Sequence, residues 1–299
     1  MQTISIGTEH RAEEIIERLD EGLRSLRREG FDVRIGLHNR GRFTFLDCSV
    51  DPQGPDTEAL LRHTVASALS DVIVDKWEKD LVRRMIHGQY CYFSREEQDR
   101  ILDHADRNLG GEGATAGDRH SRSERKARIL NQLREYLDQN SELVVEGFLH
   151  FRLRDYLEEL EEAVDRAVDD FLTEREEREF VRLLRYFLDV QEPRVDEVHV
   201  RIRPGGSFSL VDPQGHTLRS EVLEQFVVEM VESEVSYEDL LISALITLAP
   251  RRVVIHGPVP PVWEGGVATL RGVFGDRVRD CTGCALCDLE VPKDRCPTC

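Results

Sequence analysis

Five of the seven cysteines lie in the last nineteen residues, CTGCALCDLEVPKDRCPTC. They form a CxxCxxC run that is followed, after eight residues, by a CxxC pair; the residues are Cys281, Cys284, Cys287, Cys296 and Cys299. A CxxC pair presents two thiolates in one tight turn, and two such pairs supply the four ligands of a tetrahedral zinc ion. The spacing therefore predicts a metal-binding tail.

Two sets of four cysteines fit a zinc ion. One set is Cys284, Cys287, Cys296 and Cys299, and the other replaces Cys287 by Cys281. The CxxCxxC run also occurs in bacterial ferredoxins, where a Cys-Pro follows after three residues rather than eight, so a [4Fe–4S] cluster is the alternative. Four thiolates leave no open position for water, which predicts a structural zinc that supplies the folding energy of a segment too short to have its own core.

The remaining reactive side chains are better explained by packing. Cys48 lies in a predicted strand, and Cys91 has aromatic neighbours. His256 ends a predicted strand and could face a crevice, but a lone histidine is more often structural. Asp169 and Asp170 lie opposite the apolar stripe of a predicted helix, where solvated carboxylates are usual. The chain has no P-loop, no GxGxxG after a strand and no GxSxG, so we expect a protein that is not an enzyme.

The elements expected to hold these residues are mostly helical. The N-terminal region is predicted to form a small strand–helix–strand–strand unit. It has an alternating run, then an amphipathic helix with Leu19 and Leu23 on its apolar face, then two further alternating runs. Ser94 and Glu97 form a capping-box pattern. The other expected elements are helices over 58–109 with a break near 87–94, helices over 123–140, 143–172, 173–190, 220–233, 236–249 and 263–276, a hairpin over 197–215, and strands at 251–257 and 277–280.

These patterns predict an α+β fold that is predominantly helical, with small β elements near both ends and a cysteine-rich metal knuckle at the C-terminus. The segment LGGEGATAGDRHSRS is rich in glycine and lacks an apolar anchor, so it reads as a linker. The expected organisation is an N-terminal α+β domain over 1–109, a flexible linker over 110–122, a helical domain over 123–280 and the metal-binding tail over 281–299.

The charge and hydropathy of the chain restrict its partners and its location. The formal net charge of −18 repels the phosphates of nucleic acids and anionic lipid headgroups. The N-terminus has no secretion signal, and the apolar stretch LLISALITLA is about half as long as a membrane-spanning helix. We therefore expect a cytoplasmic protein with no membrane span, in which thiols stay reduced and cysteine clusters bind metal or serve in redox chemistry.

The segments FRLRDYLEELEEAVDRAVDDFL, LLISALITLAPRRVVIH and FGDRVRDCTGCALC resemble the YtxC-like family of sporulation proteins, over residues 145–287. The resemblance implies a role in endospore-forming bacteria and brings no catalytic residues with it. We therefore expect a non-enzymatic protein whose zinc tail docks an unidentified protein partner. The alternatives are an iron–sulfur redox protein and a zinc-ribbon nucleic-acid binder.

Overall fold

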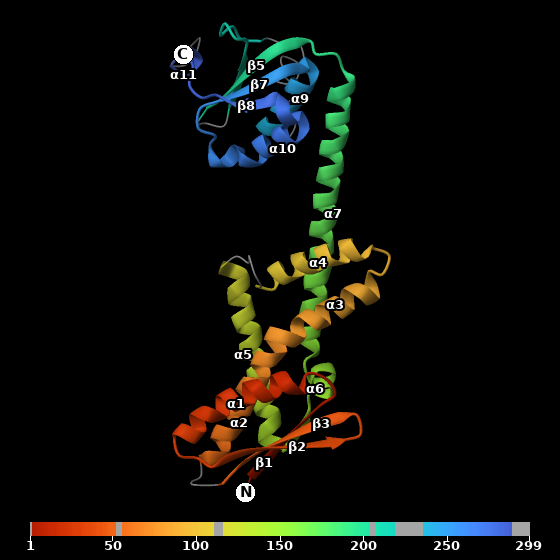
Figure 1. Ribbon diagram of the computed structural model, residues 1–299, viewed down its shortest axis with the longest axis vertical. Coiled ribbons are helices and arrows are strands. Elements are labelled where there is room, and N and C mark those ends of the chain that lie inside the picture. The colour runs from red at the N-terminus through yellow and green to blue at the C-terminus, as the bar shows by residue number, and fades with distance from the viewer. Residues whose placement is uncertain (1, 52–55, 111–115, 204–206, 219–235, 289–299) are drawn as a thin grey trace, which may run out of the picture. The chain divides into compact units, whose positions relative to one another are not determined.

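The computed structural model describes residues 2–51, 56–110, 116–203, 207–218 and 236–288. The chain forms two compact units, Met1–Thr173 and Glu174–Cys299, which are called here the N-terminal and the C-terminal unit. The division falls inside the long helix α7, Arg154–Val190 (Figure 1). Among the described helices, none combines the length and the apolar content that a bilayer-spanning segment requires.

The N-terminal unit contains a four-stranded sheet with the order β2-β3-β1-β4. The strands are β1 (Gln2–Thr8), β2 (Val33–Arg40), β3 (Phe43–Val50) and β4 (Glu142–Val144). The pairs β1–β3 and β2–β3 are antiparallel, whereas β1 and β4 are parallel. Helix α1, Ala12–Arg28, buries Ile15, Leu19, Leu23 and Leu26 in the same core cluster as the buried strand residues. Each such side chain contributes about 1.5–3 kcal/mol by leaving water.

Further helices complete this unit. They are α2 (Thr57–Val72), a π-helical turn (Ile73–Trp77), α3 (Glu78–Gln89), α4 (Arg95–Asn108), α5 (Ala116–Gln139), α6 (Val145–Arg152) and the first part of α7. Helix α4 begins with the expected capping box: Ser94 Oγ accepts from the Glu97 N–H, and the Glu97 carboxylate accepts from the Ser94 N–H. The predicted apolar stripe of α7 lies in the core through Leu160, Val164 and Phe171.

A buried ion pair joins three helices of the N-terminal unit. The Arg125 side chain on α5 is 1% exposed and donates to both carboxylate oxygens of Glu78 on α3, at 2.9 and 3.2 Å. The Tyr156 hydroxyl on α7 donates to the same carboxylate at 3.0 Å, and Arg125 also donates to the Leu109 carbonyl at 2.7 Å. Burial, and then the charge of Glu78, raise the pKa of Tyr156. This network satisfies a charge pair that would otherwise be costly in the core.

The C-terminal unit contains a second four-stranded sheet, with the order β6-β5-β7-β8. The strands are β5 (Val195–Ile202), β6 (Phe208–Val211), β7 (Pro250–His256) and β8 (Val278–Asp280). Strands β5, β7 and β8 are parallel to one another, and β6 is antiparallel to β5. The other elements of this unit are α9 (Tyr237–Leu248), α10 (Glu264–Phe274), α11 (Ala285–Asp288) and two short 3-10 turns, Pro261–Trp263 and Gly275–Arg277.

One face of this second sheet packs against helices. Val198 and Val200 of β5 and Val253 and Ile255 of β7 belong to one buried cluster. Residues from α7, α9 and α10 fill the same cluster; they are Leu188, Leu241, Ala244, Leu245, Val267, Leu270, Val273 and Phe274. Because successive side chains of a strand point to opposite faces, the intervening residues of β5 and β7 face away from these helices. The candidate site described below is built on that other face.

The expected fold class is confirmed: the protein is predominantly helical, with one small sheet in each unit and a cysteine–histidine cluster near the C-terminus. One local difference concerns 143–172, which the sequence places in a single helix. The structure forms β4 first and continues as α6, because β1 has a free edge that pairs with Leu143 and Val144. The turn expected near 204–206 and the helix expected over 220–233 lie outside the described residues.

The two compact units can be set beside the expected domains, whose boundaries stay a prediction. The predicted linker over 110–122 overlaps α5, which begins at Ala116, whereas residues 111–115 are not described. Ile129, Leu133 and Leu137 of α5 are buried in the N-terminal core, so this helix belongs to the first unit. The division between the two compact units lies within α7.

Candidate metal centre

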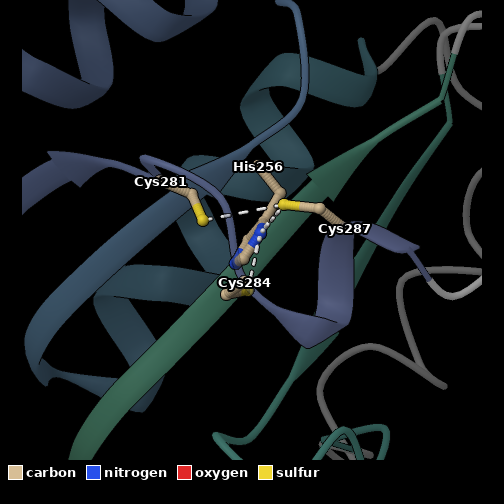
Figure 2. Close-up of side chains that lie close together, drawn as sticks. All are labelled: His256, Cys281, Cys284 and Cys287. Atoms are coloured by element: carbon tan, nitrogen blue, oxygen red, sulfur yellow. Dashed lines mark hydrogen bonds between the residues drawn. The ribbon is translucent and has the colours of Figure 1, made fainter.

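Three of the five tail cysteines come together with a histidine. The Sγ atoms of Cys281, Cys284 and Cys287 and one ring nitrogen of His256 all lie within 4.8 Å of one another (Figure 2). The other two cysteines of the tail, Cys296 and Cys299, lie outside the described residues. The described part of the tail thus contributes three thiols, and the sheet contributes the fourth donor.

The pairing of two parallel strands brings His256 and Cys281 together. His256 is the last residue of β7, and β8 pairs with β7 through Val253 with Val278 and Ile255 with Asp280. The Cys281 N–H continues the ladder by donating to the Ile255 carbonyl at 2.9 Å. The two residues therefore stand side by side at the carboxyl ends of neighbouring parallel strands, where α/β sheets usually place ligand sites.

The other two cysteines are presented by a tight turn. Gly283 has a φ of 115°, a conformation that favours glycine, and its N–H points to Cys281 Sγ at 3.4 Å. The chain then enters the single turn of α11, where the Cys287 N–H donates to the Cys284 carbonyl at 2.9 Å. Leu286 within this turn is buried and lies against the backbone at Gly215, which holds the turn to the unit.

Three of the distances between donor atoms are close to those around a single ion. Cys281 Sγ and Cys287 Sγ are 3.6 Å apart, and His256 Nδ1 lies 3.2 Å from Cys287 Sγ and 3.8 Å from Cys284 Sγ. Sulfurs that lie about 2.3 Å from a tetrahedral zinc are about 3.8 Å apart, and a sulfur–nitrogen pair about 3.6 Å apart. A disulfide requires about 2.05 Å, so these sulfurs are not bonded to each other. The donor set could hold a metal ion.

The orientation of His256 is set by a chain of hydrogen bonds on the same sheet face. Its Nε2 atom lies 2.7 Å from Nδ1 of His199, and His199 Nε2 lies 3.0 Å from a carboxylate oxygen of Glu197. The Arg252 guanidinium lies 3.5 Å from the other oxygen of that carboxylate. An ionised carboxylate only accepts, so His199 donates to Glu197 and accepts from His256. The lone pair of His256 Nδ1 then faces the sulfurs, as in histidine ligands oriented by a carboxylate.

The protonation states of the donors can be described from their surroundings. His256 is 3% exposed, and burial, followed by the charges of His199 and Arg201, lowers its pKa. Burial raises the pKa of Cys284, but hydrogen bonds from neighbouring backbone N–H groups and thiols outweigh burial and lower it overall. The Gly283 N–H lowers the pKa of Cys281, yet burial and the adjacent sulfurs raise it overall. A neutral imidazole beside a thiol with a lowered pKa is a suitable start for metal binding, which requires deprotonated ligands.

The structure also places the residues that the sequence assigned to packing. Cys48 is buried in β3, and burial, then the Asp47 charge, raises its pKa to about 12, so it stays a thiol. Cys91 is exposed. Asp170 accepts from Asn108 at 3.1 Å on an exposed face of α7, and Asp169 is exposed as well.

The sequence gives only a weak indication that His256 is a metal-ligand candidate. Twenty-four residues lie between it and Cys281, and no second histidine stands nearby in the chain to mark it as a ligand. The signal was its position at a strand end before Gly257, where φ is 79° and the chain turns away. His199 and Glu197, which orient it, come from another strand and gave no linear signal.

The fold and the site together define a predominantly helical α+β protein with a candidate metal centre of one histidine and three cysteines. The model of the YtxC-like family matches residues 63–279, and the chain belongs to this family. It is similar to the uncharacterized protein YtxC of Bacillus subtilis (strain 168), with 29% identity over 217 residues, which is 72% of this chain and 75% of that protein. No solved structure matches the chain. The family match includes His256 and ends before Cys281.

Proposed function

We propose that this protein carries a structural zinc ion bound by His256, Cys281, Cys284 and Cys287. The observation that carries the proposal is the convergence of four donor atoms within 4.8 Å, with three of their separations close to those around one tetrahedral ion. The bound ion would supply folding energy to a terminal segment that is too short to bury a core. Four protein ligands close the coordination shell, and a catalytic zinc needs an open position, so we propose a function other than catalysis.

The same distances favour one ion over an iron–sulfur cluster. In a [4Fe–4S] cluster each cysteine binds a different iron, so the ligand sulfurs are separated by the width of the cluster. The Cys281 and Cys287 sulfurs are 3.6 Å apart, which is the spacing of two ligands on the same ion. Zinc is also common in sites with three cysteines and one histidine. We therefore place zinc ahead of the iron–sulfur alternative.

For its biological role, we propose that the protein acts in the cytoplasm during endospore formation and that the zinc knuckle docks a protein partner. The sporulation role rests on the family, and the compartment on the need for reduced thiols. The docking role rests on position: Cys287 is exposed, Cys281 and Cys284 are half-buried, and the knuckle lies on the sheet face away from the helical core. A rigid knuckle at the surface can present its backbone and side chains to a partner without taking part in a reaction.

The metal is tested by elemental analysis and native mass spectrometry of the full chain, purified without oxygen. We expect a colourless protein with one zinc per chain. Cys284→Ser and His256→Ala should lose the ion, whereas the Cys296→Ser/Cys299→Ser double variant should keep it. A brown protein that contains iron and sulfide would show an iron–sulfur cluster in place of zinc. Loss of zinc only in the double variant would show that the proposed ligand set is wrong.

The docking role is tested separately. Wild-type and Cys284→Ser proteins would be used as baits in crosslinking from sporulating cells, with the Cys91→Ser variant as a matched control. We expect a partner that is captured by wild type and Cys91→Ser and lost with Cys284→Ser. A partner set that is identical for all three baits would contradict docking through the knuckle.

A further inference from the structure

An apolar surface of the C-terminal unit lies exposed along the last three turns of α7. Five large apolar side chains there are 57–67% exposed; they are Phe180, Leu183, Tyr186, Phe187 and Val190, called here the α7 stripe. Ten exposed large apolar side chains occur among the described residues, and half of them belong to this stripe. Scattered exposed apolar residues are ordinary, whereas a contiguous group of them marks an interaction site.

The α7 stripe is not the side with which this helix packs in its own unit. Leu188 is 1% exposed in the core of the C-terminal unit, and Val181 and Leu184 pack against that core. Val181 also lies against α10, where a Cβ added at Gly272 would be 3.0 Å from its methyl group. At 3.6 residues per turn, the centre of the stripe lies about 130° around the helix from these three residues. Helix α7 is therefore apolar on two sides, and only one of them packs against described residues of its unit.

The area of the stripe is sufficient for a contact between two chains. Aromatic side chains present roughly 150–250 Å² each, so the exposed parts of Phe180, Tyr186 and Phe187 amount to roughly 350 Å². Leu183 and Val190 bring the total to roughly 500 Å² per chain. Two such stripes placed face to face would bury roughly 1,000 Å², which is near the lower limit for a specific interface between proteins. An interface of this size predicts reversible association.

The spacing within the stripe is suited to another helix of the same kind. Phe180, Leu183, Phe187 and Val190 follow one another at intervals of three, four and three residues. This is the spacing at which the side chains of two helices interlock along a common seam. In a twofold dimer the same patch is used on both chains, so the stripe of a second copy supplies a partner with matching spacing.

The charges around the stripe favour a second copy over a lipid surface. Residues 174–190 hold four arginines and five carboxylates, so their formal charge is −1, in a chain whose formal net charge is −18. Helices that bind anionic membranes through an apolar face carry an excess of Lys and Arg, which this segment lacks. Because its charges nearly balance, two copies can approach each other here with little of the repulsion that the whole chain would produce.

We infer that the α7 stripe docks against the α7 stripe of a second copy of this chain. The contact makes a twofold dimer through the C-terminal unit, with the Phe180, Leu183 and Phe187 side chains at its centre. The inference goes beyond the proposed function, because it uses none of the four metal-binding candidates.

The test is sedimentation velocity of the full chain at about 1–100 µM under reducing conditions, which prevent disulfides between chains. We expect the mass to rise with concentration from 34.4 kDa to twice that value, with a dissociation constant of about 1–50 µM. Phe187→Glu should raise this constant at least about tenfold, because it places a charge inside the contact. Phe151→Glu is the matched control, since Phe151 is 66% exposed on α6, and should dimerise like wild type.

A second measurement does not depend on the folding of Phe187→Glu. Benzoylphenylalanine in place of Tyr186 should crosslink two wild-type-like chains on illumination, and mass spectrometry should locate the link within residues 180–190 of the second copy. A chain that stays monomeric at about 100 µM, or a dimer that Phe187→Glu and Phe151→Glu affect equally, would overturn the inference. Crosslinks confined to one chain would assign the stripe to the fold of that chain and would overturn it as well.

Discussion

Replacing His199 by phenylalanine should weaken binding of the proposed zinc ion without changing its stoichiometry. His199 touches none of the three sulfurs, but its Nδ1 accepts from His256 Nε2 at 2.7 Å, and both rings are buried. Phenylalanine keeps the ring and removes the acceptor, so the His256 N–H is left without a partner and the imidazole can rotate or change tautomer. We therefore expect His199 to act by positioning His256 in the proposed metal site.

The size of the effect follows from that single hydrogen bond. Leaving a buried polar group unpaired costs about 1–3 kcal/mol, and 1.4 kcal/mol corresponds to about a tenfold change in affinity. Loss of a partner that orients a metal-binding histidine usually lowers affinity by about 10- to 100-fold. We therefore expect the dissociation constant for zinc to rise by about 10- to 100-fold in His199→Phe.

The assay is competition for zinc against a chromophoric chelator, with the full chain under reducing conditions. His199→Asn serves as the rescue variant, because its side-chain oxygen can occupy the Nδ1 position and accept from His256, and should recover most of the affinity. His150→Phe, at an exposed histidine of the other unit, should match wild type. If His199→Phe binds zinc as tightly as wild type, or if His199→Asn is as weak as His199→Phe, the hydrogen-bond chain does not orient the ligand.

Three further changes test other parts of the structure. Arg125→Met should lower the free energy of unfolding by about 3–5 kcal/mol in urea denaturation, because it leaves the Glu78 carboxylate buried without a positive partner. Adding Glu78→Gln should recover part of the loss, and no recovery would mean that packing dominates. The pKa of Cys48 is about 12 in the fold, so this thiol ionises more readily in the unfolded chain. Relative to Cys48→Val, the wild-type free energy of unfolding should therefore fall by about 1.4 kcal/mol for each pH unit from about 9 toward 12. Parallel curves of unfolding free energy against pH for the two proteins would contradict this. Gly283→Ala should lower zinc affinity at least about fivefold in the chelator assay, because the φ of 115° strains a residue with a side chain by about 1–3 kcal/mol. Gly265→Ala, in an open helical position, is the control. Equal zinc affinities of the two variants would show that the turn at residue 283 relaxes without strain.

The sequence predicted the elements whose signals are local. The apolar spacing of Ile15, Leu19 and Leu23 specified α1, and Ser94 with Glu97 specified the start of α4. These features depend on neighbours within one or two turns, so they can be recognised along the chain. Strand β4 could not be recognised in this way, because three residues form a strand there only through pairing with β1, which lies far away in the sequence.

The same distinction applies to the candidate site. All five tail cysteines were predicted as metal-binding candidates because CxxCxxC and CxxC are local patterns, with two of the first three in each zinc set; the structure brings Cys281, Cys284 and Cys287 together. The fourth donor, His256, depends on the parallel pairing of β7 with β8, which no periodicity encodes. The participation of Cys296 and Cys299 stays a prediction.

The register between β7 and β8 has a consequence for how the C-terminal unit matures. His256 ends one strand and Cys281 follows the other, so a slip of one residue would turn one donor to the opposite side of the sheet. The complete donor set exists only after both strands have paired correctly. Binding of the proposed ion would then stabilise only those chains in which β7 and β8 are in the correct register. In misaligned chains the thiols would stay unbound and reactive.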